Sequence, residues 1–264
     1  CETVVFVGGI SPQLEGEEMP IEISGFKGGD RTNIELPKVQ RNFLKALKEA
    51  GKKVVFVNCS GSAIALTPET ESCDAILQAW YPGQEGGEAV ARVLFGEYNP
   101  AGKLPITFYK NSEQLPDFKD YSMKGRTYRY MNDALFPFGY GLSYTSFRIG
   151  DATLSNSILK KGEKITLKVP VSNVGKKDGT EVVQVYVKDP ADTEGPLKSL
   201  KAFERVEVKA GKTAEAIITL DSRNFELFDA ATNTVRAKAG KYEVYYGSSS
   251  ADKDLKKLDV SIEY

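Results

Sequence analysis

Hydrophobic residues in the first half of the chain form strand-like runs and helical faces in turn. Residues 3–8 are a continuous apolar run that ends in Gly8-Gly9, and residues 54–57 and 75–80 form two further runs. Runs of this kind are typical of parallel strands that are buried on both faces. After Pro37, a pattern with helical period predicts a helix that ends at Gly51. Its apolar face consists of Val39, Phe43, Leu44, Leu47 and Ala50.

A second helical pattern follows a glycine cluster at residues 83–87 and ends at Gly96. Its expected core face consists of Ala89, Val90, Val93 and Leu94. Residues 104–108 then continue the α/β alternation, which predicts an α/β fold with a mostly parallel sheet. Three or four strands are visible in the sequence, whereas a typical sheet has about 5–6. We therefore expect an α/β three-layer sandwich whose sheet is N-terminally incomplete.

The hydrophobic pattern changes to a period of two after about residue 147. Residues 164–169, 183–187, 214–220 and 242–245 alternate in this way, and turn signals containing glycine separate them. Short strands at this spacing, without a helical period, favour an antiparallel β-sandwich. The sequence therefore predicts two domains, an α/β domain over residues 1–146 and an all-β sandwich over residues 147–264.

Composition excludes several classes of function. The chain has 35 basic and 36 acidic residues and a net charge of −1, so we expect no nucleic-acid partner. No run of about 18 apolar residues is present, so we expect no membrane span. Histidine is absent, which excludes Ser-His-Asp catalysis and His-based zinc sites from this chain. The three cysteines show no C-x-x-C spacing, and neither a metal nor an organic cofactor is implied.

Carboxylates are concentrated in the loop that follows the first strand. Glu15, Glu17 and Glu18 lie within four residues of one another, and Asp30-Arg31 follows downstream. Loops at the carboxyl ends of parallel strands are where α/β sheets bind ligands. Like charges in close proximity raise the pKa of a carboxyl group, as a general acid requires. Taken alone, however, the cluster is better explained as a solvated acidic loop.

Two longer segments identify a family. Residues 79–87 read AWYPGQEGG and residues 99–105 read NPAGKLP; residues 125–130 read GRTYRY and residues 136–145 read FPFGYGLSYT. Together they resemble glycoside hydrolase family 3, in its C-terminal α/β domain and the start of its fibronectin-III-like domain. The resemblance covers essentially the whole chain. Trp80 and the aromatic residues between Tyr128 and Tyr144 are interpreted as packing residues rather than as a sugar platform.

The resemblance implies an exo-acting retaining β-glycosidase. In that family an N-terminal (β/α)8 barrel carries an Asp nucleophile, and this sequence contains no barrel. The family's general acid/base maps to Glu17, with Glu15 and Glu18 as alternatives, because the spacing to Asp30-Arg31 is longer than in many relatives. Asp30, Arg31 and Tyr81 are candidate substrate contacts, and Tyr121 is a further one. Asp30 and Arg31 are also interpreted as a structural ion pair that holds the loop.

Details of the motifs favour the β-xylosidase branch, which takes part in xylan degradation, with β-glucosidase as the alternative. The expected substrate is a β-linked oligosaccharide or aryl glycoside, and family resemblance suggests a periplasmic or secreted protein. A hypothesis of another class is a non-catalytic carbohydrate-binding or scaffolding module. Retaining hydrolysis needs two carboxylates, so this chain alone is expected to be inactive.

Overall fold

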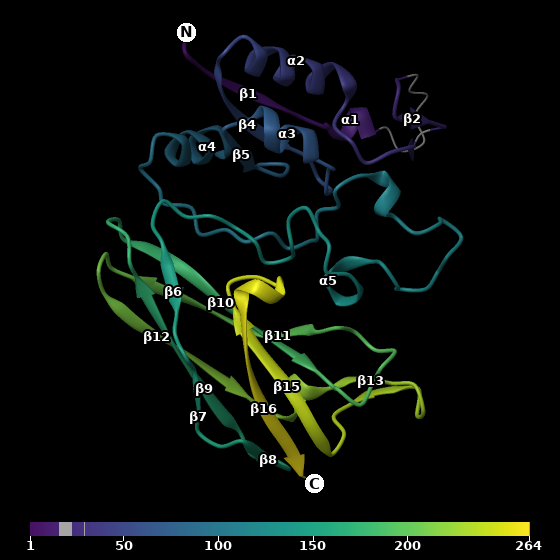
Figure 1. Ribbon diagram of the computed structural model, residues 1–264, viewed down its shortest axis with the longest axis vertical. Coiled ribbons are helices and arrows are strands. Elements are labelled where there is room, and N and C mark those ends of the chain that lie inside the picture. The colour runs from purple at the N-terminus through teal and green to yellow at the C-terminus, as the bar shows by residue number, and fades with distance from the viewer. Residues whose placement is uncertain (16–22, 29, 264) are drawn as a thin grey trace. The chain divides into compact units, whose positions relative to one another are not determined.

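The structure is a computed structural model that describes residues 1–15, 23–28 and 30–263 (Figure 1). Within these residues, packing divides the chain into two units. The first contains Cys1–Phe95, Thr107–Gly125 and Asp133–Phe136, and the second contains Gly96–Ile106, Arg126–Asn132 and the chain from Pro137 onward. The chain therefore passes between the units five times, after residues 95, 106, 125, 132 and 136. The domain boundary between residues 146 and 147 stays a prediction.

The first unit is built on a parallel sheet with the strand order β1-β4-β5. Its elements are β1 (Thr3–Gly9), α1 (Pro12–Glu15), β2 (Phe26–Lys27), β3 (Asp30–Arg31), α2 (Lys38–Glu49), β4 (Lys53–Cys59), α3 (Thr67–Ser72), β5 (Ala75–Gln78), α4 (Gly86–Leu94) and the 3-10 turn η1 (Ser112–Gln114). Thr3 lies opposite Lys53 and Gly9 opposite Cys59, while β5 pairs with the other edge of β4. All three strands therefore end at the same edge of the sheet.

Two strand predictions need correction. The third strand ends at Gln78 rather than at Trp80, because Trp80 has a φ of 59°, which belongs to the left-handed region and not to a strand. Residues 104–108 form no strand. Leu104 instead donates to Tyr140 O (2.8 Å) and accepts from Gly139 N (2.7 Å) within the second unit. Pro105 follows directly, and proline cannot donate to a sheet ladder.

The apolar face predicted for α2 is confirmed at Leu44 and Leu47 but not at Val39 and Phe43. Gln40, Leu44 and Leu47 are the more buried side chains at a helical spacing of four and three, whereas Val39 and Phe43 are exposed. The predicted end of the helix is confirmed, because Gly51 adopts a φ of 71° and donates to Lys48 O at 2.9 Å. No helix within the described ranges is long and apolar enough to cross a membrane.

Helix α3 was not predicted from the sequence. Its residues, TPETES, have no apolar periodicity, but parallel strands such as β4 and β5 need a crossover between them. The helix is attached through Glu69, which is buried and accepts two hydrogen bonds from the Arg41 guanidinium of α2 at 2.7 and 3.1 Å. The ion pair between Arg41 and Glu69 therefore attaches α3 to α2, where other helices use a row of apolar side chains.

The second unit is rich in strands. Its elements are α5 (Thr127–Tyr130), β6 (Phe147–Ile149), β7 (Thr153–Leu154), β8 (Ile158–Lys160), β9 (Ile165–Asn173), β10 (Gly179–Lys188), β11 (Ser199–Val208), β12 (Thr213–Leu220), η2 (Ser222–Phe225), β13 (Leu227–Asp229), β14 (Thr234–Arg236), β15 (Gly240–Gly247), η3 (Asp252–Asp254) and β16 (Leu255–Glu263). One sheet has the order β11-β10-β15-β16-β8, and the other has the order β12-β9-β6, with β7 also paired to β9. Buried residues from both sheets form one hydrophobic cluster. Each of the four predicted period-two segments lies within or overlaps a strand: β9, β10, β12 and β15.

Strand β10 is buried on both faces. Val183, Val185 and Val187 belong to the core cluster, but Gln184 and Tyr186 on the opposite face are buried as well. Tyr128 and Phe138 stack on each other with ring centroids 4.4 Å apart, and both contact the Tyr186 ring. Tyr128 and Phe138, two of the aromatic residues interpreted as packing residues, therefore cover this outer face.

Gln184 joins the outer face of β10 to the FPFGYG segment. Its Nε2 atom donates to Gly139 O at 3.0 Å and to Ser248 O at 2.7 Å, and its Oε1 atom accepts from the Tyr186 hydroxyl at 2.5 Å. Gly139 has a φ of 79°, and a Cβ atom there would overlap the Gln184 side chain. Position 139 therefore requires glycine both for its conformation and for this close approach.

We expect Gln184→Met to destabilise the chain by about 2–4 kcal/mol, because it leaves buried carbonyl groups and a hydroxyl without their partner. Tyr186→Phe, which removes only the hydroxyl, should cost less. Urea unfolding of both variants measures the difference. A Gln184→Met variant as stable as the parent chain would contradict this account of the buried amide.

Candidate functional site

The carboxyl end of β1 is fixed by contacts on two sides. Gly9 has a φ of 125°, and a Cβ atom there would overlap the carbonyl oxygen of Cys59 at the end of β4. On the other side, the Gln40 amide of α2 accepts from Gly9 N at 2.8 Å and donates to Gly9 O at 2.7 Å. Ile10 follows, fully buried, and donates to Cys59 O at 3.0 Å. The loop with the candidate carboxylates therefore begins at a rigid point.

The candidate carboxylates come directly after this point. Helix α1 begins where Leu14 N donates to Ser11 O (3.0 Å) and to Ser11 Oγ (3.2 Å), and Glu15 is its last residue. Glu17, Glu18 and the side chain of Glu15 lie outside the part of the chain that the structure describes. The assignment of the general acid/base therefore stays a prediction, while the structure describes where its loop starts.

Asp30 and Arg31 form the second strand of a short hairpin. Phe26 pairs with Arg31, and Lys27 pairs with Asp30. The Asp30 carboxylate accepts from Arg31 N at 2.7 Å, and Arg31 Nη1 donates to the Ser62 hydroxyl at 3.2 Å. Arg31 thus connects the hairpin to the loop after β4. The predicted ion pair between the two residues, and their contact with substrate, stay predictions.

Tyr81 connects the ends of two strands. Its hydroxyl donates to Ile10 O at 2.8 Å, and its ring covers Gly61, where a Cβ atom would lie 2.5 Å from the ring. The ring remains partly exposed. The structure therefore brings Tyr81 to the residue from which the acidic loop departs, as a substrate contact at this edge would require. Trp80 beside it packs edge-on against the buried Phe108, with centroids 6.2 Å apart.

A buried polar cluster supports the same edge of the sheet. Asn58 Nδ2 donates to Gln78 Oε1 at 2.6 Å and to Ser60 Oγ at 3.2 Å. Ser60 Oγ in turn donates to Ser62 O at 3.0 Å. Asn58 and Ser60 are fully buried, and Asn58 Oδ1 has no hydrogen-bond partner among the residues that the structure describes. These side chains hold the turn after β4, whose Ser62 receives Arg31.

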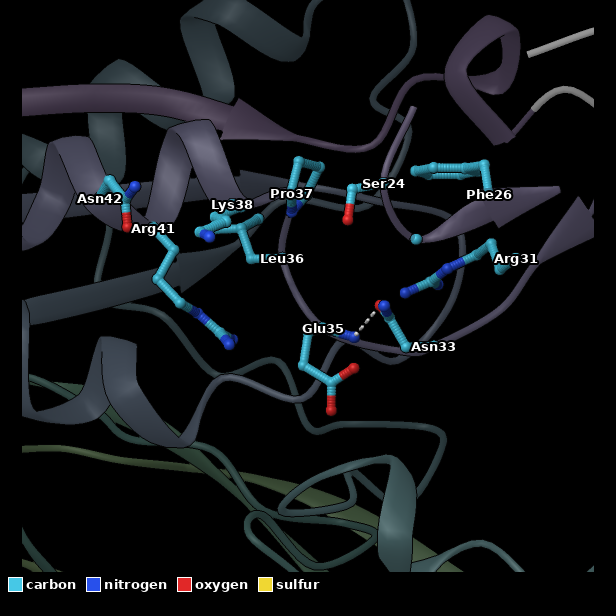
Figure 2. A pocket seen from close by; sticks show the side chains of 11 residues that line it. Ser24, Phe26, Arg31, Asn33, Glu35, Leu36, Pro37, Lys38, Arg41 and Asn42 are labelled. Atoms are coloured by element: carbon cyan, nitrogen blue, oxygen red, sulfur yellow. Dashed lines mark hydrogen bonds between the residues drawn. The ribbon is translucent and has the colours of Figure 1, made fainter. Parts of the chain in front are cut away.

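A pocket of about 340 Å³ lies between the hairpin and α2. Figure 2 shows the side chains of Arg31, Glu35 and Arg41 around it, each from a different segment. Asn33 Oδ1 accepts from Glu35 N at 3.2 Å. The Glu35 carboxylate accepts from Ser112 N at 2.9 Å and from Ser112 Oγ at 2.7 Å, while Ser112 Oγ accepts from Ile34 N.

The pKa of Glu35 is shifted in the direction that disfavours a general acid. Partial burial raises its pKa, but the hydrogen bonds from Ser112, with a smaller contribution from Arg41, outweigh this and hold the pKa below its ordinary value. A general acid needs the opposite shift. Glu35 therefore attaches η1 to the hairpin segment rather than taking part in proton transfer.

Gln40, Glu35 and Ser112 were missed by the sequence analysis. Gln40 had one available signal, because it precedes Leu44 and Leu47 at helical spacing on the inward face. Glu35 and Ser112 lie far apart in the sequence and no local pattern joins them. Within the described ranges, no group of three or more Cys, Asp and Glu side chains is placed to hold a metal ion.

We expect Ser112→Ala to destabilise the chain by about 1–2 kcal/mol at pH 7, because Glu35 loses a hydroxyl donor and Ile34 N loses its acceptor. The pKa of Glu35 is lowered by folding, so its contribution is present above the ordinary value of about 4.3 and is lost as the pH falls through the folded pKa. The loss in free energy of unfolding caused by Ser112→Ala should therefore be smaller at pH 3 than at pH 7 when it is measured by urea unfolding.

Ser72→Ala, which removes an exposed hydroxyl bonded to Pro68 O, is the control. An equal cost of Ser112→Ala at both pH values would contradict the role given to the Glu35 charge.

Two known domain families match this chain. Residues 1–144 match the glycosyl hydrolase family 3 C-terminal domain, and residues 181–250 match a fibronectin type III-like domain. The chain is 65 % identical to a xylan 1,4-beta-xylosidase of Xylanibacter ruminicola, over 98 % of this chain and 30 % of that protein. It is 39 % identical to a periplasmic beta-glucosidase of Salmonella typhimurium, over 85 % of this chain and 31 % of that protein.

Solved structures agree with these relatives. A β-glucosidase from Erythrobacter marinus superposes with a TM-score of 0.83 at 31 % identity, covering 100 % of this chain and 35 % of that one. A β-glucosidase from Listeria innocua in complex with isofagomine gives a TM-score of 0.80 at 29 % identity, covering 99 % and 37 %. The chain thus spans about a third of the length of these proteins. From the two matched domains and these relatives, the chain belongs to glycosyl hydrolase family 3, as its C-terminal domain followed by a fibronectin type III-like domain.

Proposed function

We propose that this chain is the C-terminal part of an exo-acting retaining β-glycosidase that acts on β-linked xylo-oligosaccharides or aryl β-xylosides. The observation that carries the proposal is the rigid point at Gly9, from which a loop rich in glutamate leaves the carboxyl edge of the sheet. The 65 % identity to a xylan 1,4-beta-xylosidase supports xylose over glucose. A β-glucosidase is the alternative, because several relatives carry that name.

Glu17 is the proposed general acid/base. In retaining hydrolysis one carboxylate attacks the anomeric carbon, and the other protonates the leaving oxygen and then deprotonates water, with the two about 5–5.5 Å apart. We propose that Glu17 has the second role and that an N-terminal (β/α)8 barrel of the same protein supplies the Asp nucleophile. Tyr81, which bonds to Ile10 O where the loop begins, and Arg31, which bonds to Ser62, are proposed to contact the sugar. Asp30 is proposed to contact it as well.

The proposed sheet is larger than the three strands described. Strand β1 pairs with β4 along one edge, and Val5 and Val7 on it are exposed, as are Val39 and Phe43 on α2. Val5 and Val7 share one face of β1, and β1 is an edge strand among the described residues, so their exposure indicates that a neighbouring element covers this part of the sheet in the longer protein. We propose that a further strand of the longer protein pairs with β1 and completes a three-layer α/β sandwich.

We also propose that the protein is periplasmic or secreted, where polymeric xylan is accessible.

In the longer enzyme, Glu17→Ala should lower kcat for an aryl β-xyloside by about 10²- to 10⁴-fold, the usual contribution of a general acid/base. Azide should restore part of the turnover of a substrate with an activated leaving group, because that substrate needs no proton donor. Glu15→Ala and Glu18→Ala are matched controls within the same loop. A loss confined to Glu15→Ala or Glu18→Ala would move the assignment to that residue. The 264-residue chain alone should give no turnover, and appreciable turnover by it would contradict the two-part site.

The proposed neighbour of β1 can be tested by stability. Val7 and Val235 are both 63 % exposed in this chain, so Val7→Lys and Val235→Lys should each change its stability by no more than about 0.5 kcal/mol. In the longer protein, Val7→Lys should lower Tm by several degrees, because the lysine would be buried under the added chain that covers this face of β1, whereas Val235→Lys should not. Equal Tm values for the two variants there would show that this face of β1 stays uncovered.

A further inference from the structure

The loop from Leu115 to Gly125 holds two aromatic side chains out in solvent. Phe118 and Tyr121 are each 91 % exposed, so neither ring is packed against the rest of the chain. They lie three residues apart in one loop of the first unit. Single exposed hydrophobic residues are common, but neighbouring exposed aromatic rings mark a surface that binds something.

The backbone that carries these rings is ordered by its own hydrogen bonds. Asp117 Oδ1 accepts from Lys119 N at 2.8 Å, and Asp120 Oδ1 accepts from Ser122 N at 2.8 Å. Asp120 N donates to Asp117 O at 2.9 Å between the two rings. The ends of the loop are adjacent, since a Cβ atom on Gly125 would lie 3.5 Å from Pro116 Cγ. A compact closed loop presents the rings in advance of binding, which lowers the entropic cost of binding.

The start of the loop is attached to the candidate site. The loop follows η1, where Ser112 accepts from Ile34 N and donates to the Glu35 carboxylate. Ile34 and Glu35 come three and four residues after Arg31. Figure 1 shows this loop, in teal, at the same end of the first unit as β2. The rings are therefore carried by a loop whose start is bonded to the segment that follows the hairpin.

The composition of the loop favours a neutral sugar over a protein partner. Asp117 and Asp120 are balanced by Lys119 and Lys124, so the loop has no net charge to recruit an ionic ligand. Charged residues alternate with the two rings, whereas the cores of protein interfaces are depleted in Lys and Asp. β-Linked xylose and glucose rings have equatorial substituents, so each ring presents a face of C–H groups that stacks on an aromatic ring. Two rings in one loop suit successive sugars of an oligosaccharide.

We propose that Phe118 and Tyr121 form a stacking platform for a neutral β-linked oligosaccharide, contacting sugar units beyond the one that is cleaved. The class of ligand rests on the proposed function, but binding by this chain does not depend on catalysis. The platform acts on longer substrates and has little to contact on a monosaccharide glycoside. It would give the protein a preference for oligosaccharides over short substrates.

The first test is binding to the 264-residue chain, titrated with xylotetraose and with cellotetraose and followed by amide chemical shifts in NMR. Shifts should cluster in residues 115–125, and the variant Phe118→Ala/Tyr121→Ala should raise Kd by at least about tenfold through the loss of two stacking contacts. Phe203→Ala is the matched control, because Phe203 is also exposed, at 61 %, but lies on β11 in the second unit. Absence of binding at millimolar sugar, or equal Kd values for the parent and the double variant, would overturn the proposal.

The second test uses the longer enzyme and the ratio of kcat/KM for xylotetraose to kcat/KM for an aryl β-xyloside. The double variant should lower this ratio at least about tenfold, mainly through a higher KM for xylotetraose. An unchanged ratio would overturn the proposal. Loss of assembly of the longer protein in the double variant, seen by size-exclusion chromatography or thermal unfolding, would show that the rings contact protein instead and would also overturn it. If the longer enzyme has no glycosidase activity, the proposed function is wrong. The binding test on the 264-residue chain still shows whether Phe118 and Tyr121 bind an oligosaccharide.

Discussion

The backbone at Gly9 runs so close to the end of β4 that no side chain fits between the two strands. The amide of Gln40 occupies the other side, so both the donor and the acceptor of Gly9 are bonded to a side chain of α2. The direction in which the chain leaves β1 is therefore set by a backbone contact and one helix. Tyr81 and Arg31 then reach the same region from β5 and from the hairpin. A substitution that displaces the backbone at Gly9 would therefore also displace Ile10, whose carbonyl oxygen accepts from the Tyr81 hydroxyl.

The second unit depends on a comparable constraint at β10. This strand is covered on one face by the hydrophobic cluster and on the other by Tyr128, Phe138 and the turn at Gly139. The carbonyl groups of Gly139 and Ser248 pack against this outer face and need a hydrogen-bond donor. The side-chain amide of Gln184 is that donor. The sequence motifs that identified the family are therefore, in part, the residues that cover β10.

Much of the fold could be predicted from the sequence because its signals are local. The apolar runs at β1 and β4, the glycine that ends α2 and the period-two segments of the second unit each depend on neighbouring residues. The errors have the opposite origin. Residues 104–108 look like a strand, but Leu104 pairs with Gly139 and Tyr140, which are distant in the sequence. Val39 and Phe43 were expected on the core face of α2, yet both are exposed in this chain, although the Phe43 ring contacts Phe6 of β1.

The candidate site was only partly predictable for the same reason. The acidic loop and Tyr81 stand out in the sequence, the first by its charge and the second by its place in a family motif. Glu35 and Ser112 are 77 positions apart, and Asn58 meets Gln78 only because β4 and β5 pair in parallel. Such contacts are properties of the topology, and no window of residues contains them.

The repeated passage of the chain between its two units has an evolutionary consequence. A domain joined by a single linker can be gained, lost or exchanged by one recombination event, and one cut by a protease releases it intact. Here the second unit includes residues 96–106 and 126–132, which lie within the region 1–144 that matches the glycosyl hydrolase family 3 C-terminal domain. A recombination break between that domain and the fibronectin type III-like domain would therefore leave these two segments without the strands they pack with, so the second domain is not freely exchangeable.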